Sequence, residues 1–277
     1  MAADHGLTAG GRVSWDPALY GANNAHHRRH DDDFLASLPL PAAARVLDLG
    51  CGVGDFTVRL ASAVPEGEVI GVDAAAALIA AARRERVDAA VRFAVCRAQD
   101  VSATFPPDHF DVVVSRAVLH WITAEEQESV LAGVWQVLQP GGRFRAEFGG
   151  RGQLGDLVSL LDEESDRVGG PVRPWYFPTA EEYRGLLTAA GFRIGSSGWV
   201  RLVRQRRSFP DQSALTGFLV SQVLVAYEIA MTADQLREFR GRATGRAIRE
   251  LRRADGSFDL DFVRLDLMAI RPNAENA

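Results

Sequence analysis

The chain has 277 residues, of which 47% are hydrophobic and 24% are charged, and its formal net charge is −5. These values are typical of a soluble globular protein with one large or two modest domains, and the negative charge gives no indication of nucleic-acid binding. The chain has only two cysteines, which excludes a disulfide framework and favours a cytoplasmic location for the protein. No spacing of Cys or His residues suits a metal ion. No apolar run approaches the ~20 residues that span a membrane.

The first 40 residues predict a flexible tail over 1–13 and a helical segment over 14–40. The tail is rich in Gly, Ala and Asp, and Pro17 can begin the helix that follows. Clustered His and Arg side chains accompany Trp15 and Tyr20 in this segment. The segment is either an amphipathic cover helix with a solvated basic face or a lid whose side chains contact a ligand.

The next stretch predicts a strand, a tight glycine-rich turn and the start of a helix. Asp48 lies in a run of Val and Leu, and glycines alternate from Gly50 to Gly54. Glycine tolerates positive φ and lets a ligand approach the backbone closely. A dinucleotide site requires G-x-G-x-x-G, but the third glycine position counted from Gly50 is Asp55. A carboxylate beside the turn would repel phosphates and suits a ligand with a cationic group.

The run Val-Leu-Asp-Leu-Gly-Cys-Gly-Val-Gly at residues 46–54 resembles motif I of the class I S-adenosylmethionine (SAM) dependent methyltransferases. The resemblance implies an α/β fold, with a Rossmann-like seven-stranded, mostly parallel sheet whose last strand is antiparallel. It also implies that Asp48, Gly50, Cys51 and Gly52 line the methionine end of SAM. An ordinary strand–turn–helix would not need an acid together with three alternating glycines.

Residues 68–73 predict a second strand that ends in Asp73, in the position of motif II. Two adjacent ribose hydroxyls can both donate to one carboxylate, so an acid at this strand end suits the ribose of SAM. We assign Asp73 and the adjacent Ala74 to cofactor binding. An Ala-rich helix is expected over 74–86.

Residues 91–96 alternate in polarity and predict a third strand. In many relatives an Asp-Ala pair follows, and its Asp accepts a hydrogen bond from the adenine amino group. Arg97 stands in the place of that Asp. We therefore assign adenine recognition to the backbone of Ala98 and to Gln99.

Residues 110–115 form a continuous apolar run, as expected of a buried parallel strand. The segment after it resembles the family pattern Asn-Ala-x-Leu-His-Trp, with Arg116 in place of Asn. We assign Ser115 and Arg116 to the cofactor. His120 and Trp121 follow the carboxyl end of the strand, where open α/β sheets bind ligands, so His120 is either a structural residue or a pocket residue.

Residues 123–150 predict a helix that ends at Pro-Gly-Gly, residues 140–142, followed by a fifth strand over 143–150. Acidic residues in the first turn and apolar residues at helical spacing support the helix. The strand carries Glu147, which is either a pocket acid or a surface partner for an Arg.

Three patterns resemble the trans-aconitate methyltransferase-like group of this family. They are Trp-x-x-x-x-Tyr at 15–20, Leu-x-Pro-Gly-Gly at 138–142 and Glu-Phe-Gly-Gly at 147–150. In that group an N-terminal helical segment folds over SAM. The resemblance implies that Tyr20 and Arg29 reach the SAM carboxylate, which a guanidinium fork can pair in two places. Arg28 and His27 are alternatives to Arg29.

After the core at 41–150, the region 151–277 is expected to complete the sheet and to add helical insertions over 151–180 and 211–254 that form the acceptor pocket. A helix over 154–168 precedes an aromatic segment that is either a core plug or a pocket wall. The next helix begins with a capping box from Thr179 to Glu182.

The last part of the chain predicts two strands separated by helix. The sixth strand is expected over 192–207, with a solvated edge at Arg201, Arg204, Arg206 and Arg207. A helical stretch follows over 211–251, with an apolar stripe at Leu215, Phe218, Leu219, Val223 and Tyr227. The closing strand is expected over 258–269, where polarity alternates, and it is expected to be antiparallel.

These motifs imply transfer of a methyl group from SAM to a small molecule, for example in secondary metabolism. A carboxylate acceptor needs no base, and Arg116 or Arg173 would orient it. A hydroxyl or acidic carbon needs a base, which His120 or Glu147 would supply. The candidate substrate-binding residues are Trp15, His120, Trp121, Arg173, Trp175 and Tyr176.

Other functions remain open on the sequence alone. They are C-methylation, a cyclase-like protein that binds SAM without transferring its methyl group, and a dinucleotide-dependent dehydrogenase. A nucleic-acid methyltransferase is disfavoured, because the chain lacks a basic-aromatic module and the Asn/Asp-Pro-Pro-Tyr/Phe tetrapeptide after the fourth strand. We expect a small-molecule acceptor as the only partner, no membrane association, and a monomer or homodimer.

Overall fold

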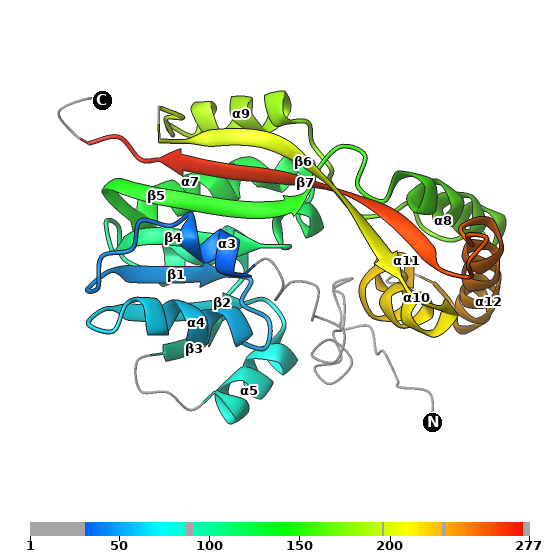
Figure 1. Cartoon of the computed structure of the whole chain (residues 1–277). Coiled ribbons are helices and arrows are strands. Elements are labelled where there is room, and N and C mark those ends of the chain that lie inside the picture. Colours follow the sequence, from blue (N-terminus) through cyan, green and yellow to red (C-terminus); the bar gives the residue numbers. More distant parts are fainter. Residues whose placement is uncertain (1–30, 87–90, 196, 229–230, 274–277) are drawn as a thin grey trace. The chain divides into compact units, whose positions relative to one another are not determined.

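The computed structural model describes residues 31–86, 91–195, 197–228 and 231–273 (Figure 1). These residues form two compact units. The sheet unit comprises residues 31–151, 176–203 and 264–273, and the helical unit comprises residues 152–175 and 204–263. Each unit is described by itself below.

A seven-stranded sheet with the order β3-β2-β1-β4-β5-β7-β6 organises the fold. The strands are β1 Arg45–Leu49, β2 Glu68–Asp73, β3 Val91–Val95, β4 Phe110–Arg116, β5 Leu138–Gly149, β6 Trp199–Phe209 and β7 Phe258–Ile270. The strands β1 to β5 pair in parallel, whereas β7 runs antiparallel to β5. The expected Rossmann-like sheet with an antiparallel last strand is therefore confirmed.

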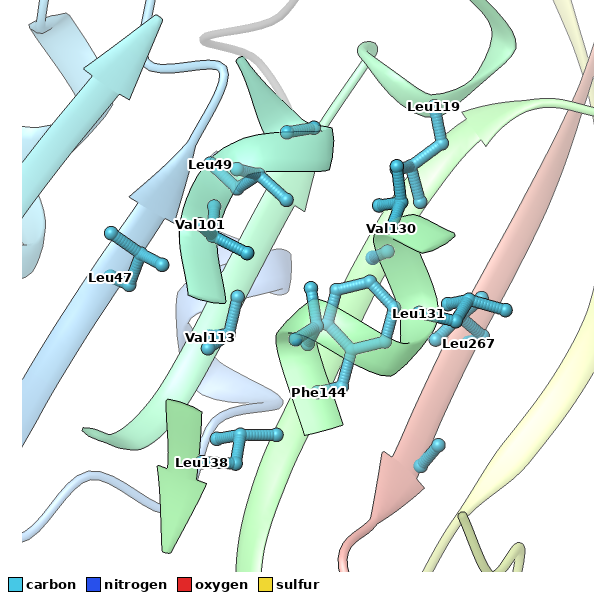
Figure 2. Close-up of a cluster of buried hydrophobic side chains, with 14 of the residues drawn as sticks. Leu47, Leu49, Val101, Val113, Leu119, Val130, Leu131, Leu138, Phe144 and Leu267 are labelled. Carbon is cyan, nitrogen blue, oxygen red and sulfur yellow. The ribbon is translucent and has the colours of Figure 1, made fainter. Parts of the chain in front are cut away.

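Helices cover both faces of the sheet (Figure 1). On one face α6 Val101–Thr104, α7 Gln127–Val137 and α9 Ala180–Ala189 pack on the strands, and on the other lie α3 Asp31–Ala36, α4 Asp55–Ala63 and α5 Ala76–Glu85. Figure 2 shows the core of the first face, where Leu47, Val113 and Phe144 of three strands meet Leu131 of α7. All four side chains are fully buried, and each stabilises the fold by about 1.5–3 kcal/mol.

Local sequence signals account for some of the helix ends. The predicted capping box is confirmed at α9, because the Glu182 N–H donates to Thr179 Oγ1 at 3.1 Å and the Thr179 N–H donates to the Glu182 carboxylate at 2.6 Å. Helix α7 follows the short 3-10 turn η3 Ala124–Glu126 and ends at Val137. The Pro-Gly-Gly segment was expected to be a turn, but it lies within β5.

The sixth strand begins later than the sequence predicts. Residue 192 was its expected start, but β6 runs from Trp199 to Phe209. Gly191 turns the chain with φ of 92° after α9, and Phe192 then buries its ring in the core. After Phe192 the chain forms an isolated bridge between Arg193 and Ile270 before β6 begins.

The helical unit contains α8 Gly155–Arg167, α10 Gln212–Phe218, the π-helix η4 Leu219–Val223, α11 Val225–Glu228 and α12 Ala233–Glu250. The stretch expected as one helix over 211–251 is thus divided, and α12 begins with a second capping box at Thr232. The predicted apolar stripe is buried at all of its positions, which are Leu215, Phe218, Leu219, Val223 and Tyr227.

The prediction of a solvated position is wrong for one arginine of this unit. Arg207 was expected on a solvated edge, but its guanidinium lies over the rings of Phe209 at 4.4 Å and Phe218 at 5.0 Å. Planar guanidinium groups stack well on aromatic faces. Arg201 and Arg206 are exposed, as expected.

Candidate active site

The turn between β1 and α4 takes a conformation that requires glycine. Gly50, Gly52 and Gly54 all have positive φ, at 81°, 57° and 81°. A Cβ on Gly50 would lie 2.0 Å from Cγ2 of Val118, so this turn is packed closely against the segment after β4. The N–H groups of Gly50 and Cys51 donate to the Val72 carbonyl at 2.7 and 2.9 Å, which fixes the turn to β2.

Asp73 ends β2 beside this turn, and backbone groups fix the orientation of its carboxylate. The Gly52 N–H donates to Oδ2 at 3.0 Å and the Ala75 N–H donates to Oδ1 at 2.8 Å. Burial raises the pKa of Asp73. Because each carboxylate oxygen can accept more than one hydrogen bond, both oxygens can still accept from a ligand. Ala74 follows with an exposed side chain.

Asp48 lies beneath the turn with only 2% of its surface exposed. It accepts a hydrogen bond from the Thr57 hydroxyl at 2.7 Å, and this bond ties β1 to α4. Burial raises its pKa to about 6, although Thr57 and Arg116 act in the opposite direction. Burial likewise raises the pKa of Cys51, so its thiol is neutral and its backbone makes the contacts described above.

The carboxyl end of β3 carries a polar cluster that the sequence analysis did not identify. Glu126 accepts from Arg97 at 3.1 Å and from the Gln99 amide at 3.0 Å, and Ala98 between them is buried. Arg97 therefore has a carboxylate partner where the family carries an Asp. The sequence signal was the acidic pair at 125–126, which was interpreted only as a helix start.

Arg116 at the end of β4 connects the sheet to α3. It pairs with the buried Asp31, and its guanidinium lies 4.9 Å from the ring centre of Phe34 and 4.7 Å from that of Phe56. Arg59 of α4 also pairs with Asp31, at 3.0 Å. Three other predicted site residues, Trp15, Tyr20 and Arg29, lie outside the described residues. Ser115 is buried and donates to the Leu49 carbonyl at 3.0 Å.

His120 lies in the 3-10 turn η2 Leu119–Trp121, directly after β4. Its Nδ1 accepts from the Gly149 N–H at 3.3 Å, so the neutral ring carries its proton on Nε2. Removal of the ring from water, together with nearby Arg264, lowers its pKa to about 3. The rings of Trp121 and Phe177 lie 5.5 and 5.9 Å away. His120 is therefore a neutral hydrogen-bond donor at physiological pH.

Glu147 and Arg264 form an ion pair of 2.8 Å in the sheet unit. Arg264 is 8% exposed. Glu147 was expected to be either a pocket acid or a surface partner of an Arg, and the structure shows an Arg partner that is buried. Arg264 was missed, although a charged residue within the closing strand, whose neighbours Val263 and Leu265 are apolar, was an available signal.

The aromatic segment after α8 contributes to both units. Its Tyr176 N–H donates to the His120 carbonyl at 3.0 Å in the sheet unit. Arg173 and Trp175 belong to the helical unit. There Asp162 pairs with Arg173 and accepts from the Tyr227 hydroxyl at 2.8 Å, and the Trp175 ring meets Tyr227 edge-on at 5.8 Å.

Comparisons with known proteins identify the family. A family model described as a methyltransferase domain matches residues 46–142. A trans-aconitate 2-methyltransferase of Methylobacterium nodulans is 36% identical over 286 residues, which cover 94% of this chain and 99% of that protein. The chain is a class I SAM-dependent methyltransferase. A trans-aconitate 2-methyltransferase of Variovorax paradoxus is 38% identical over 182 residues, which is 65% of each chain.

Solved structures share the fold of this methyltransferase. The YcgJ protein from Bacillus subtilis superposes with a TM-score of 0.61 and 18% identity, and covers 90% of this chain and 100% of its own. The [4+2]-cyclase SpnF gives a TM-score of 0.57 and 19% identity over 99% of this chain and 89% of its own. Haemonchus contortus phosphoethanolamine N-methyltransferase 2, solved with SAM, gives a TM-score of 0.58 and 19% identity, and the match covers 93% of this chain and 57% of that protein.

The cofactor of this enzyme is SAM, and the residues of the glycine turn fit it. Gly52 carries no side chain that would block a ligand, and Asp73 offers two fixed acceptors at the adjacent strand end. The described residues contain no cluster of His, Cys, Asp or Glu that could hold a metal ion. Within the same described ranges, every helix is too short or too polar to cross a bilayer.

Proposed function

We propose that this methyltransferase transfers the methyl group of SAM to a carboxylate oxygen of a small organic acid. The observation that carries the proposal is that neither candidate base is arranged as one. The Nδ1 of His120, its one acceptor nitrogen, already accepts from the Gly149 N–H, its pKa of about 3 makes the ring a weak base, and Glu147 is paired with Arg264 at 2.8 Å. A carboxylate is anionic at neutral pH and needs no base to react. The two trans-aconitate 2-methyltransferase relatives support the same acceptor class.

SAM supplies an already activated methyl group on a sulfonium centre, so the protein chiefly positions the two reactants. We assign the ribose hydroxyls to Asp73 and the methionine end to the glycine turn, which Asp48 supports from below. The backbone of Ala98 and the oxygen of the Gln99 amide are assigned to the adenine edge. The Gln99 amide nitrogen donates to Glu126, which leaves the amide oxygen available to accept a hydrogen bond from the adenine amino group. In the lid segment, Tyr20 and Arg29 are proposed to hold the SAM carboxylate.

On the acceptor side, His120 is proposed to donate its Nε2–H to the reacting carboxylate. Because the Gly149 N–H occupies Nδ1, the ring cannot change to the other neutral tautomer without losing that bond. A neutral donor orients a carboxylate without neutralising the oxygen that attacks. We also assign Trp121 and Tyr176 to the acceptor pocket.

An assay of product identity tests this function. The purified enzyme is incubated with SAM and, separately, with trans-aconitate, other di- and tricarboxylic acids, phenols and acidic carbon compounds, and both S-adenosylhomocysteine and methylated product are measured by mass spectrometry. We expect methyl esters of a carboxylic acid together with stoichiometric S-adenosylhomocysteine. Methyl ethers or C-methyl products without esters would contradict the proposal, as would tight SAM binding without any conversion to S-adenosylhomocysteine, which is the behaviour of a cyclase-like protein.

A further inference from the structure

We propose that Arg264 is the residue that holds the carboxylate of the acceptor, and that Glu147 weakens this hold. The inference rests on the proposed function and adds the binding group that the function requires. The sequence offered Arg116 and Arg173 for this role. In the structure Arg116 pairs with Asp31, and Arg173 pairs with Asp162 in the helical unit.

The register of the sheet places Arg264 beside His120. Gly149 of β5 is the register partner of Arg264 in β7, and the same Gly149 donates its N–H to His120 Nδ1. Side chains two positions apart on a strand project from the same face, so Glu147 and Arg264 project together. One glycine thus has the neutral donor on one side and the guanidinium on the other.

Arg264 has unused hydrogen-bonding capacity. A guanidinium has five N–H donors in a planar fork, and Nη1 donates to Glu147 at 2.8 Å. Its Nε is buried and has no hydrogen-bond partner among the residues that the structure describes. A buried donor without a partner is costly, and a carboxylate oxygen would satisfy it.

The charges around Arg264 favour an added anion. Burial and, to a smaller extent, nearby Arg116 lower the pKa of Arg264, whereas Glu147 acts in the opposite direction, and burial together with nearby Arg264 lowers the pKa of His120. Two buried cations therefore lie near this position, and Arg116 already shares its carboxylate Asp31 with Arg59. An acceptor carboxylate would add a negative charge beside these two guanidinium groups, whereas a neutral phenol would not.

Glu147 competes with the acceptor for the same guanidinium. It is mostly buried and has Arg264 as its ion-pair partner. Replacing it with the uncharged Gln frees the guanidinium and removes a repulsive charge. The two substitutions Arg264→Gln and Glu147→Gln should therefore change acceptor affinity in opposite directions, although both break the same ion pair.

The test measures trans-aconitate binding to the enzyme saturated with S-adenosylhomocysteine by calorimetry, with KM and kcat in parallel. We expect R264Q to raise Kd and KM about 10- to 100-fold and E147Q to lower both about 3- to 10-fold, since a hydrogen bond to a charged group has this magnitude. Arg264→Lys should recover part of the loss. The SAM Kd should stay within about twofold of the wild-type value in each variant.

Arg201→Gln is the matched control, because Arg201 of β6 also pairs with a buried acid, Asp266, but its side chain is 62% exposed. It should leave acceptor Kd unchanged. Weaker binding in E147Q as well as in R264Q would overturn the inference, because a merely structural pair would lose affinity in both. So would a folded R264Q enzyme that methylates trans-aconitate with wild-type KM, although the proposed function would then stand. A wild-type enzyme that methylates phenols but no acid would contradict the proposed function itself.

Discussion

The cofactor end and the acceptor end of the sheet unit are built in different ways. At the ends of β1 and β2, backbone groups dominate: three glycines with positive φ, amides that fix the turn to β2, and one carboxylate held by two N–H groups. At the ends of β4 and β5 and in the middle of β7, side chains dominate: His120, Glu147 and Arg264. Every class I relative must bind the same cofactor, whereas acceptors differ, and side chains are easier to exchange than a backbone turn.

The largest expected effect is at the cofactor end. Asp73→Ala removes both fixed acceptors proposed for the ribose, so the Kd for SAM should rise about 30- to 1,000-fold. Titration calorimetry measures this directly. Glu128→Gln, an exposed acid-to-amide change on α7, is the control and should have no effect. SAM affinity within a few-fold of wild type in D73A would contradict the ribose assignment.

The buried acid beneath the turn should make stability depend on pH. Because the pKa of Asp48 is about 6 in the folded protein and near 3.9 in an unfolded chain, the folded state holds this proton more tightly. The contribution of Asp48 to the free energy of unfolding therefore falls as pH rises from about 4 to 6. Asp48→Asn lacks this titrating group. The stability of the variant relative to wild type should therefore rise by up to about 3 kcal/mol between pH 4 and a pH above 6.

Chemical denaturation of both proteins at pH 4.5 and pH 8 measures this difference. A stability difference between D48N and wild type that is the same at both pH values would show that the buried carboxyl does not titrate in this window. The comparison isolates Asp48 because all other groups titrate in both proteins.

Gly50→Ala should destabilise the protein by about 1–3 kcal/mol, since it combines a positive φ with an overlap on Val118. Thermal unfolding measures the loss, and Val118→Ala in the same protein should recover part of it. Gly185→Ala in α9 has no neighbour within 4 Å of the added Cβ, so it should stabilise slightly. Equal effects of the two Gly→Ala changes would contradict the account of the turn.

The smallest expected effect separates the two possible roles of His120. Gln is a neutral side chain that can accept from the Gly149 N–H and donate to an acceptor, so His120→Gln should lower kcat by no more than about tenfold. Loss of a general base would lower it about 10²- to 10⁴-fold. His109 directly precedes the first residue of β4, at the end of the strand opposite to His120, so His109→Gln is the matched control. Single-turnover rates in both variants decide between the roles.

The sequence was informative where structure is local. The glycine turn, Asp73 and the capping box at Thr179 all follow from patterns within a few residues, and each lies where it was predicted. The division of the helical stretch over 211–251 and the late start of β6 were not predicted, because the π-helix η4 and tertiary packing decide them.

The acceptor side could not be read in the same way, for a physical reason. His120, Glu147 and Arg264 come from three distant segments, and only the pairing of β5 with β7 places Arg264 opposite Gly149. The alternating pattern of a strand fixes which face each side chain occupies, but it does not fix which residue of a distant strand stands opposite. The partner of Arg116 was hidden because only tertiary packing brings it to Asp31 of α3, which lies 85 positions away.

The dependence of kcat on pH with a carboxylic acid acceptor tests the central claim most directly. Methylation of a carboxylate without a general base predicts a kcat that is constant from about pH 6.5 to 9, because His120 stays neutral and the acceptor stays ionised over this range. A kcat that rises about tenfold per pH unit to a plateau would show that a proton must be removed from the acceptor or the enzyme before transfer. That result would contradict the account and return His120 or Glu147 to the role of a base.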